Sequence, residues 1–338
     1  MEVLVIGGSL FLGRAVVAEA LAVGASVTVF NRGRSGPTRA GATQVLGDRR
    51  SRSDLSQLES RQFDLVVDTC GYVPADVALS AELLAPRAGH YAFVSSINAW
   101  PGWPEHLDYR DGGVHDGSPD ATGDDVPEGM ADSEAYGWLK VGCELAVQRA
   151  FGADRATILR GGAIVGPDDS EVGRLPWWID RVARGGEVLV PGTPTDPVAL
   201  IDSRDLARFA LSGAAGTFDV PGPANRDTRA DLMAACAVAT GAAATFVYLD
   251  EDWLVDQGVG YWTELPLWIP AAVGPGVFAS YGEDAARAGL RWRPLVETVV
   301  DTWAWQCSLA DGWRPTARTP GLVPAREVEL LAAWRARQ

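Results

Sequence analysis

The chain is poor in the residue types that bind metals or form disulfides. Among its 338 residues there are only four cysteines and three histidines. The cysteines are far apart and form no CxxC pair, and the histidines lack the spacing of a zinc site. We therefore expect no bound metal, and reduced, buried thiols at Cys70, Cys143, Cys236 and Cys307.

Long apolar runs and concentrated positive charge are also missing. No apolar segment is long enough to cross a bilayer, and the first residues predict a strand instead of a leader segment. The net charge of -15 repels polyanions, and the arginines are scattered apart from a short run at 48–52 that we interpret as a solvated loop. We expect a cytoplasmic protein with a small-molecule substrate and no nucleic-acid or membrane partner.

What the chain does contain is an alternation of short β-rich runs with amphipathic segments. Such alternation predicts βαβ units, a parallel sheet and right-handed crossovers. The expected fold class is α/β, a doubly wound parallel sheet with a smaller C-terminal α/β lobe. The predicted strands of the first half are 3–6, 26–30, 43–46, 65–68, 91–95 and 155–160, and its predicted helices are 11–23, 54–58, 75–84 and 133–150.

The other segments are less regular. Residues 100–132 are rich in glycine, proline and aspartate, which predicts a long surface loop. Beyond residue 166 the pattern is mixed, and most of the 13 tryptophans lie there. In this half we expect strands at 188–190 and 198–201 and helices at 175–184, 203–211, 295–309 and 326–335.

A glycine-rich turn, Gly7-Gly8-Ser9-Leu10-Phe11-Leu12-Gly13, follows the first predicted strand and opens the first helix. In a dinucleotide-binding βαβ unit such glycines allow a tight turn, close approach of the pyrophosphate and close helix packing, and the helix N-terminus binds the anion. Leu10 stands where a middle glycine is often found, so a plain strand–helix turn remains the alternative. The predicted cofactor contacts here are Gly7, Gly8, Ser9, Phe11, Leu12 and Gly13.

The end of the second predicted strand bears on the choice of cofactor. An acidic residue there binds the ribose of NAD, whereas arginines suit the 2′-phosphate of NADP. This chain has Asn31, Arg32 and Arg34 and no acid, which favours NADP(H), with NAD(H) possible. Solvated arginines are the alternative interpretation. Asp48, after the third strand, is expected either to bind the adenine amino group or to cap the next segment.

Tyr136 and Lys140 are four residues apart and share one face of a predicted helix. A free tyrosine has a pKa of about 10, too high for a base at neutral pH, and a nearby ammonium lowers it. We therefore expect Tyr136 to exchange a proton with a substrate oxygen. Lys140 is the only lysine in a chain that otherwise uses arginine, and its compact ammonium can reach two ribose hydroxyls.

Ser95 and Ser96 close a predicted strand, and the carboxyl ends of such strands border the ligand crevice. We expect the Ser96 hydroxyl to hold the reacting oxygen near Tyr136, and Ser95 to make a structural or cofactor contact. Local hydrogen bonds to the backbone are the alternative role for both serines. The predicted catalytic residues are therefore Ser96, Tyr136 and Lys140.

With these motifs the sequence resembles the extended branch of the short-chain dehydrogenase/reductase superfamily, with its epimerase/dehydratase-like and reductase-type members. The likeness continues through Gly47-Asp48, Leu159 to Pro167, and Ile201 to Ala207. It implies a Rossmann domain over 1–166 and mainly a substrate-binding lobe with C-terminal helices over 167–338, some segments of which return to the first domain. It also implies a homodimer and cofactor contacts at Thr69, Cys70, Gly71, Gly161 and Gly162.

Two departures from the family pattern bear on the reaction. Sugar dehydratases of the family carry an Asp-Glu pair after the catalytic hydroxyl, where this chain has Ile97 and Asn98. Many nucleotide-sugar epimerases have an asparagine at the position of Ala163. A subgroup with a similar glycine turn binds RNA, which the charge of -15 opposes. These features argue against dehydration and RNA binding, and they weaken the epimerase hypothesis.

The leading hypothesis is an NAD(P)-dependent oxidoreductase that moves hydride between the nicotinamide and a carbonyl or alcohol of a small, fairly apolar metabolite. The tryptophans of the second half motivate an apolar substrate, although packing is the alternative for any one of them. A nucleotide-sugar epimerase with tightly bound NAD and a non-catalytic binding protein are the other hypotheses. Expected substrate contacts are Ser96, Asn98, Trp100, Ala163 and Trp178.

Overall fold

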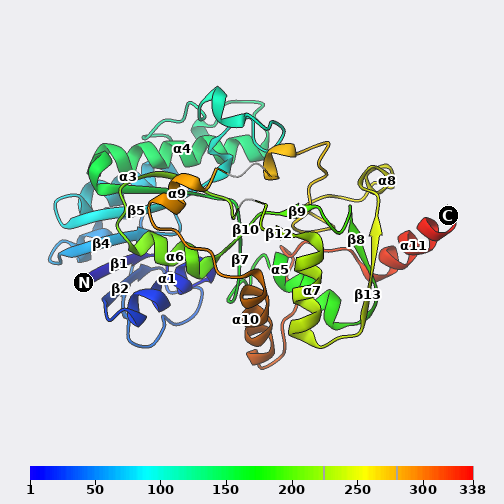
Figure 1. Ribbon diagram of the computed structural model, residues 1–338. Coiled ribbons are helices and arrows are strands. Elements are labelled where there is room, and N and C mark those ends of the chain that lie inside the picture. The colour runs from blue at the N-terminus through cyan, green and yellow to red at the C-terminus, as the bar shows by residue number, and fades with distance from the viewer. Residues whose placement is uncertain (224, 279–280, 338) are drawn as a thin grey trace.

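The computed structural model describes residues 1–223, 225–278 and 281–337 and is built on one large parallel sheet (Figure 1). Its seven strands run in the order β11-β6-β5-β4-β1-β2-β3, and every neighbouring pair is parallel. The predicted α/β class and doubly wound sheet are therefore confirmed. The strands are β1 (Glu2–Ile6), β2 (Ser26–Asn31), β3 (Thr43–Leu46), β4 (Phe63–Asp68), β5 (Ala88–Ser96), β6 (Ala156–Gly161) and β11 (Gly216–Val220).

Helices cover both faces of the sheet, and alternate residues of its strands pack against them. On β1, Val3 and Val5 join the core under one layer, whereas Leu4 and Ile6 join the core under the other. Figure 1 shows α3 and α4 on one side and α1 and α6 on the opposite side. The first layer contains α2 (Arg52–Leu55), α3 (Pro74–Leu84) and α4 (Asp132–Phe151), and the second contains α1 (Phe11–Ala22) and α6 (Ser203–Leu211).

The strand order reverses at β1, with β2 and β3 on one side of it and β4, β5 and β6 on the other. At such a switch point the connections leave the strands in opposite directions and open a crevice at the carboxyl ends, where ligands bind. The glycine turn after β1 therefore shares one edge of the sheet with the segments that follow β4, β5 and β6.

The second half of the chain forms a smaller α/β lobe with a core of its own. β8 (Gly186–Pro191) and β13 (Ala244–Leu249) pair in parallel, and Trp178 and Trp268 are fully buried in that core. β11 and α6 belong to the large sheet and its helical layer, while the domain boundary at residue 166 stays a prediction. The remaining helices are α5 (Arg174–Ala183), α7 (Arg229–Thr240), α8 (Glu251–Asp256), α9 (Glu283–Arg287), α10 (Leu295–Ser308) and α11 (Pro324–Arg335).

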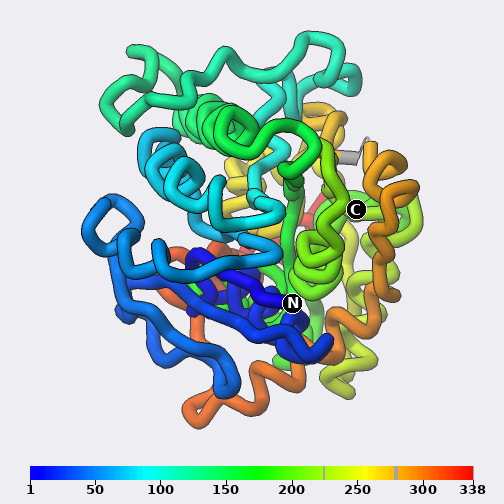
Figure 2. Tube along the Cα trace, turned by 90° about the vertical axis from the view of Figure 1, so that its left-hand side faces the viewer, coloured from blue at the N-terminus to red at the C-terminus, as the bar shows by residue number. Residues whose placement is uncertain are grey.

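Most predicted elements are confirmed within a few residues, and the exceptions have physical reasons. The predicted strand 198–201 is two short strands, β9 (Pro197–Val198) and β10 (Leu200–Asp202), because the chain switches partners between β12 (Asp227–Thr228) and β7 (Ala163–Val165). The predicted loop 100–132 runs along the outer side of α4 in Figures 1 and 2. Tyr109 within this loop is nevertheless buried, so the loop carries part of the packed interior.

The cysteines and the helices test two expectations drawn from what the sequence contains little of. All four thiols are free, and Cys143 and Cys236 are buried. Cys307 is exposed on α10, so the expectation that every thiol is buried is wrong. Within the ranges that the structure describes, no helix is long and apolar enough to span a membrane.

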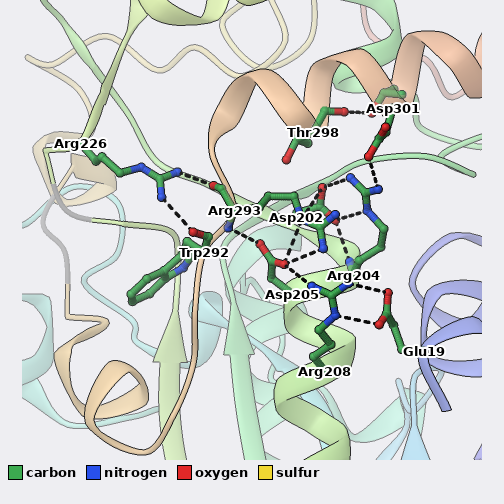
Figure 3. Close-up of polar contacts among 11 residues, drawn as sticks. Glu19, Asp202, Arg204, Asp205, Arg208, Arg226, Trp292, Arg293, Thr298 and Asp301 are labelled. Atoms are coloured by element: carbon green, nitrogen blue, oxygen red, sulfur yellow. Dashed lines mark hydrogen bonds and ion pairs between the residues drawn. The ribbon is translucent and has the colours of Figure 1, made fainter. Parts of the chain in front are cut away.

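A network of arginines and carboxylates joins the lobe to the large sheet (Figure 3). Asp202 ends β10 and Asp205 lies in the first turn of α6, and both are buried. Arg293, just before α10, donates to Asp205 at 2.7 Å and lies 3.5 Å from Asp202. Burial opposes ionisation of Asp202, but hydrogen bonds and charge from Arg204 and Arg293 outweigh it and lower the pKa of Asp202. The lobe is therefore anchored by buried, paired charges.

Arg293→Ala is expected to lower the free energy of unfolding by about 3 kcal/mol, because two buried carboxylates lose a partner. The control, Arg287→Ala, removes an exposed pair with Asp284 and is expected to cost less than about 0.5 kcal/mol. Urea unfolding followed by tryptophan fluorescence measures both variants. Equal losses would contradict the anchoring role of the network.

Candidate active site

The glycine turn between β1 and α1 has the shape of an anion cradle. Gly7 and Gly8 have φ angles of 108° and 78°, which favour glycine, and a Cβ on Gly13 would lie 2.6 Å from the Gly8 nitrogen. α1 begins after Leu10 without a capping side chain and without an acidic residue in its first turn. The free N–H groups and the dipole of α1 therefore suit the pyrophosphate of a dinucleotide.

Three other residues predicted to contact the cofactor shape this turn. The side chain of Leu12 is buried in the core between α1 and the sheet, and the predicted cofactor contact stays a prediction for its backbone N–H. Phe11 is half-buried against the same core. Asn31, at the end of β2, donates to Ser9 Oγ at 2.8 Å and to the Gly7 carbonyl oxygen at 3.2 Å. Asn31 thereby fastens the turn to the neighbouring strand.

The charged groups beyond β2 and β3 are partly free and partly paired. Arg32 and Arg34 are exposed. Asp48 accepts hydrogen bonds from Arg50, which lower the pKa of Asp48 to about 2. Asp48 also accepts the backbone N–H of Arg50 and so caps the turn that follows β3, whereas the N-cap of α2 is Ser51, whose hydroxyl accepts the Asp54 N–H. A contact between Asp48 and adenine stays a prediction.

The segment Thr69-Cys70-Gly71, after β4, rests on a buried ion pair. Asp68 is fully buried and accepts hydrogen bonds from Arg49 at 2.7 and 2.9 Å, from the Tyr91 hydroxyl at 2.8 Å and from the Cys70 N–H at 3.1 Å. The expectation that the run 48–52 is solvated is wrong for Arg49, whose side chain is 10% exposed. Burial raises the pKa of the Cys70 thiol to about 11, so this thiol is neutral beside the cradle.

The structure places the predicted catalytic residues at the carboxyl edge of the sheet. Ser96 ends β5 and is buried. Tyr136 and Lys140 lie one turn apart on α4, the tyrosine 37% exposed and the lysine 3% exposed. The Lys140 ammonium donates to the carbonyl oxygens of Gly71 at 2.8 Å and Val94 at 2.6 Å. The lysine thus joins α4 to β5 and to the segment after β4.

The electrostatics of Tyr136 differ from the expectation. Burial raises the pKa of Tyr136, and a hydrogen bond with Ser96 and the charge of Arg174 oppose that rise only in part. Burial lowers the pKa of Lys140, whose ammonium is held by backbone carbonyls. The expectation that Lys140 depresses the pKa of Tyr136 is therefore wrong for the polypeptide by itself. Sequence reasoning missed Arg174 because it lies in another lobe, far along the chain.

A buried chain of polar groups supports the ends of β5 and β6. Ser95 Oγ donates to Glu144 Oε1 at 2.5 Å, and Arg160 pairs with Glu144 at 2.6 Å. The Arg160 guanidinium lies 4.7 Å from the Trp100 ring centroid, and Trp100 Nε1 donates to Asp219 at 3.1 Å. Ser95 therefore has the structural role, one of the two expected for it. Glu144 and Asp219 carry no sequence signal, because only the fold brings their segments together.

A cavity of about 360 Å³ is lined by Asn98, two residues after Ser96. Its link to the site is Asn98, whose Oδ1 accepts the Ser96 hydroxyl at 3.0 Å. Asn98 and Trp100 thus line a space beside the site, where substrate contacts were predicted. The lining includes Asn98, Trp100, Trp103, His115, Ser133 and Glu134.

The remaining residues predicted to contact cofactor or substrate follow β6 or lie in the lobe. Gly161 lies opposite Ser96 in the register of β5 and β6, and a Cβ on Gly162 would lie 2.7 Å from Pro221 Cα. Ala163 is half-buried in β7. Trp178 is fully buried and donates to the Pro266 carbonyl oxygen at 2.6 Å, so the predicted substrate contact is wrong. Three more tryptophans that motivated an apolar substrate lie in the same core, namely Trp177, Trp253 and Trp268.

Comparisons with known proteins agree with this fold. No family model matches the chain. A curated relative, dTDP-6-deoxy-L-talose 4-dehydrogenase (NAD(P)(+)) of Kitasatospora kifunensis, is 29% identical over 336 residues, which cover 90% of this chain and 95% of the relative. UDP-glucose 4-epimerase of Thermotoga maritima with UDP-glucose has a TM-score of 0.62 at 19% identity, covering 90% and 98% of the two chains. The Bordetella bronchiseptica enzyme WbmH in complex with NAD+ has a TM-score of 0.63 at 15% identity, covering 91% and 98%.

Asp68→Asn is expected to destabilise the protein by about 3 kcal/mol at pH 7, because Arg49 would stay buried without a counter-charge. Burial opposes the charge on Asp68, but Arg49 outweighs it and lowers the folded-state pKa of Asp68. The pair therefore stabilises above the unfolded pKa of about 3.9, and this stabilisation is lost as pH falls through the folded pKa.

Urea unfolding at pH 7 and in acid is expected to show a gap between wild type and Asp68→Asn that narrows below about pH 4. Asp120→Asn, at a carboxylate whose side chain is 71% exposed, is the control and is expected to change little. A gap that stays constant with pH would show that the charge of Asp68 is not what stabilises this edge.

Proposed function

We propose that this chain is an NAD(P)-dependent oxidoreductase of the extended short-chain dehydrogenase/reductase superfamily, a proposal supported by the curated relative and by the shared fold. It moves hydride between the nicotinamide and the carbonyl or alcohol carbon of a small metabolite. The observation that carries the proposal is the position of Ser96, Tyr136 and Lys140 at the sheet edge that also holds the glycine cradle. Such a convergence of hydroxyl, phenol and ammonium suits proton transfer to a reacting oxygen.

The three side chains have distinct tasks in this proposal. The Ser96 hydroxyl holds the substrate oxygen, and the Tyr136 hydroxyl gives that oxygen a proton in reduction or takes one in oxidation. Lys140 has three N–H donors and uses two on backbone carbonyls, which leaves one for a ribose hydroxyl. A bound nicotinamide dinucleotide would supply or accept the hydride.

The proposed cofactor is NAD(P), with NADP(H) as the favoured form. The backbone of Gly7 and Gly8 and the N-terminus of α1 would hold the pyrophosphate, since neither capping side chain nor acid competes there. The exposed Arg32 and Arg34 favour the 2′-phosphate of NADP. The name of the curated relative allows both NAD and NADP.

A nucleotide-sugar epimerase with tightly bound NAD is the second candidate, favoured by the fold likeness to UDP-glucose 4-epimerase. It would use the same three residues, so retention of the cofactor separates the two proposals. A non-catalytic binding protein is less favoured, because such a protein does not need Ser96, Tyr136 and Lys140 together. We further propose that the chain is a cytoplasmic protein. We also propose that it forms a homodimer, which light scattering of the purified protein tests.

Tyr136→Phe is expected to lower kcat at least about 100-fold for any alcohol that the wild type oxidises, because the proton acceptor is lost. Cofactor affinity is expected to stay within about threefold, since the phenyl ring still packs in place. Tyr261→Phe, at a tyrosine that is 41% exposed, is the control and is expected to keep full activity. A fully active Tyr136→Phe enzyme would overturn the mechanism.

The double variant Arg32→Ala/Arg34→Ala is expected to weaken NADPH binding about tenfold or more and to leave NADH binding nearly unchanged, because only NADPH carries the 2′-phosphate. Tryptophan fluorescence of the carefully desalted protein measures both titrations, and Arg39→Ala, at another exposed arginine, is the control. NAD that survives desalting would favour the epimerase. Binding of neither nucleotide would contradict both enzymatic proposals.

A further inference from the structure

The ammonium of Lys140 is more enclosed than its proposed contact with a ribose requires. Two of its three N–H donors go to the carbonyl oxygens of Gly71 at 2.8 Å and Val94 at 2.6 Å, which leaves the third for a ligand. The residue is nevertheless only 3% exposed. A ribose hydroxyl must come within about 3 Å of Nζ to accept a hydrogen bond, so a group that covers the ammonium has to move first.

Two aromatic rings lie next to this ammonium, one in the interior and one at the surface. The ring centroid of Phe93 is 4.4 Å from Nζ, and Phe93 is fully buried. The ring centroid of Tyr72 is 5.4 Å from Nζ, and Tyr72 is 58% exposed. Both distances lie within the range at which a ring face attracts a cation. Of the two rings, Tyr72 is therefore the one that lies toward solvent and can cover Lys140.

The backbone on both sides of Tyr72 is fixed by packing. A Cβ on Gly71 would lie 2.5 Å from Phe93 Cε2 and 2.7 Å from Val77 Cγ2, so the chain passes this close to the core only as glycine. Val73 is extended, with φ -119° and ψ 123°, as expected for a residue before proline, and Pro74 is the first residue of α3. These constraints hold Tyr72 beside Lys140 through a segment that has little freedom to shift.

The ring itself has the freedom that its backbone lacks. An exposed side chain changes rotamer rapidly, because little packing has to be broken. A ring face also holds a cation more weakly than a charge-assisted hydrogen bond does. A ribose hydroxyl that accepts a hydrogen bond from the Lys140 ammonium can therefore take the place of the Tyr72 ring.

We propose that Tyr72 is a further residue of the cofactor site, whose ring covers the Lys140 ammonium in the free protein and is displaced by the ribose of a bound nicotinamide dinucleotide. The displacement rests on the proposed function, because it requires that dinucleotide. The cover does not, because the ring and the ammonium already lie together in the polypeptide by itself.

The test uses the fact that Lys140 is the only lysine of the chain. Its acetylation by N-hydroxysuccinimidyl acetate is followed at fixed pH by mass spectrometry of the peptide that contains it, with the α-amino group of the chain as internal reference. Tyr72→Ala and Tyr72→Ser remove the ring, so one of them can fail to fold without ending the test. Tyr72→Phe keeps the ring, and Tyr261→Ala removes another exposed tyrosine. Tryptophan fluorescence checks that each variant is folded.

Lys140 is expected to react about tenfold faster in Tyr72→Ala and Tyr72→Ser than in the wild type, the factor that corresponds to the loss of one partly desolvated contact between a cation and a ring. Tyr72→Phe and Tyr261→Ala are expected to react at the wild-type rate. A wild-type rate in a folded Tyr72→Ala or Tyr72→Ser protein would overturn the proposal, as would a fast rate in Tyr72→Phe.

Saturating NADPH or NADH tests the displacement. The bound nucleotide is expected to slow the acetylation of Lys140 in Tyr72→Ala to about the wild-type rate, because the ribose then occupies the third N–H donor. NADPH is also expected to bind Tyr72→Ala about threefold more tightly than Tyr72→Phe, since no ring has to be moved. A nucleotide that binds but leaves Lys140 reactive would overturn the displacement. If neither nucleotide binds and the acetylation rates still differ, the cover stands and the proposed function is what fails.

Discussion

The buried ammonium of Lys140 is the contact on which the arrangement of the site depends. It is 3% exposed and donates to the carbonyl oxygens of Gly71 and Val94, so it ties α4 to the segment after β4 and to β5. Removing a cation from water costs free energy, so an ammonium this buried is stable only where hydrogen-bond acceptors surround it. Since Tyr136 lies one turn earlier on α4, the same contact sets where the phenol stands relative to Ser96.

Elsewhere in the molecule, several buried charges are paired where segments leave or join strands. Arg49 pairs with Asp68 at the end of β4, Arg160 pairs with Glu144 beside β5, and Arg293 pairs with Asp205 after β10. Buried pairs are weak evidence for stability, but breaking one leaves an uncompensated charge, so each pair holds its segment in one place.

The parts of the site that sequence could predict are those whose geometry is local. The glycine turn follows a strand and opens a helix, and Tyr136 and Lys140 share a helix face through their spacing alone. The predictions were wrong where tertiary packing decides whether a side chain is buried. Arg49 belongs to a polar run that predicts a solvent-exposed loop, yet its side chain is buried in an ion pair with Asp68. Trp178 suggested an apolar binding surface, yet its indole packs the lobe core, because a tryptophan in a sequence does not reveal which side it faces.

By itself, the sequence determined the α/β class, the order of strands and helices in the first half, and the hydroxyl, phenol and ammonium groups available for chemistry. These follow from short-range periodicity and from residue types, which are properties of neighbours along the chain. Only the tertiary structure decided which charges are buried and which are paired. A pKa depends on desolvation and on charges within a few ångströms, and here those charges come from segments that only the folded chain brings together, as Arg160 with Glu144 and Arg293 with Asp205.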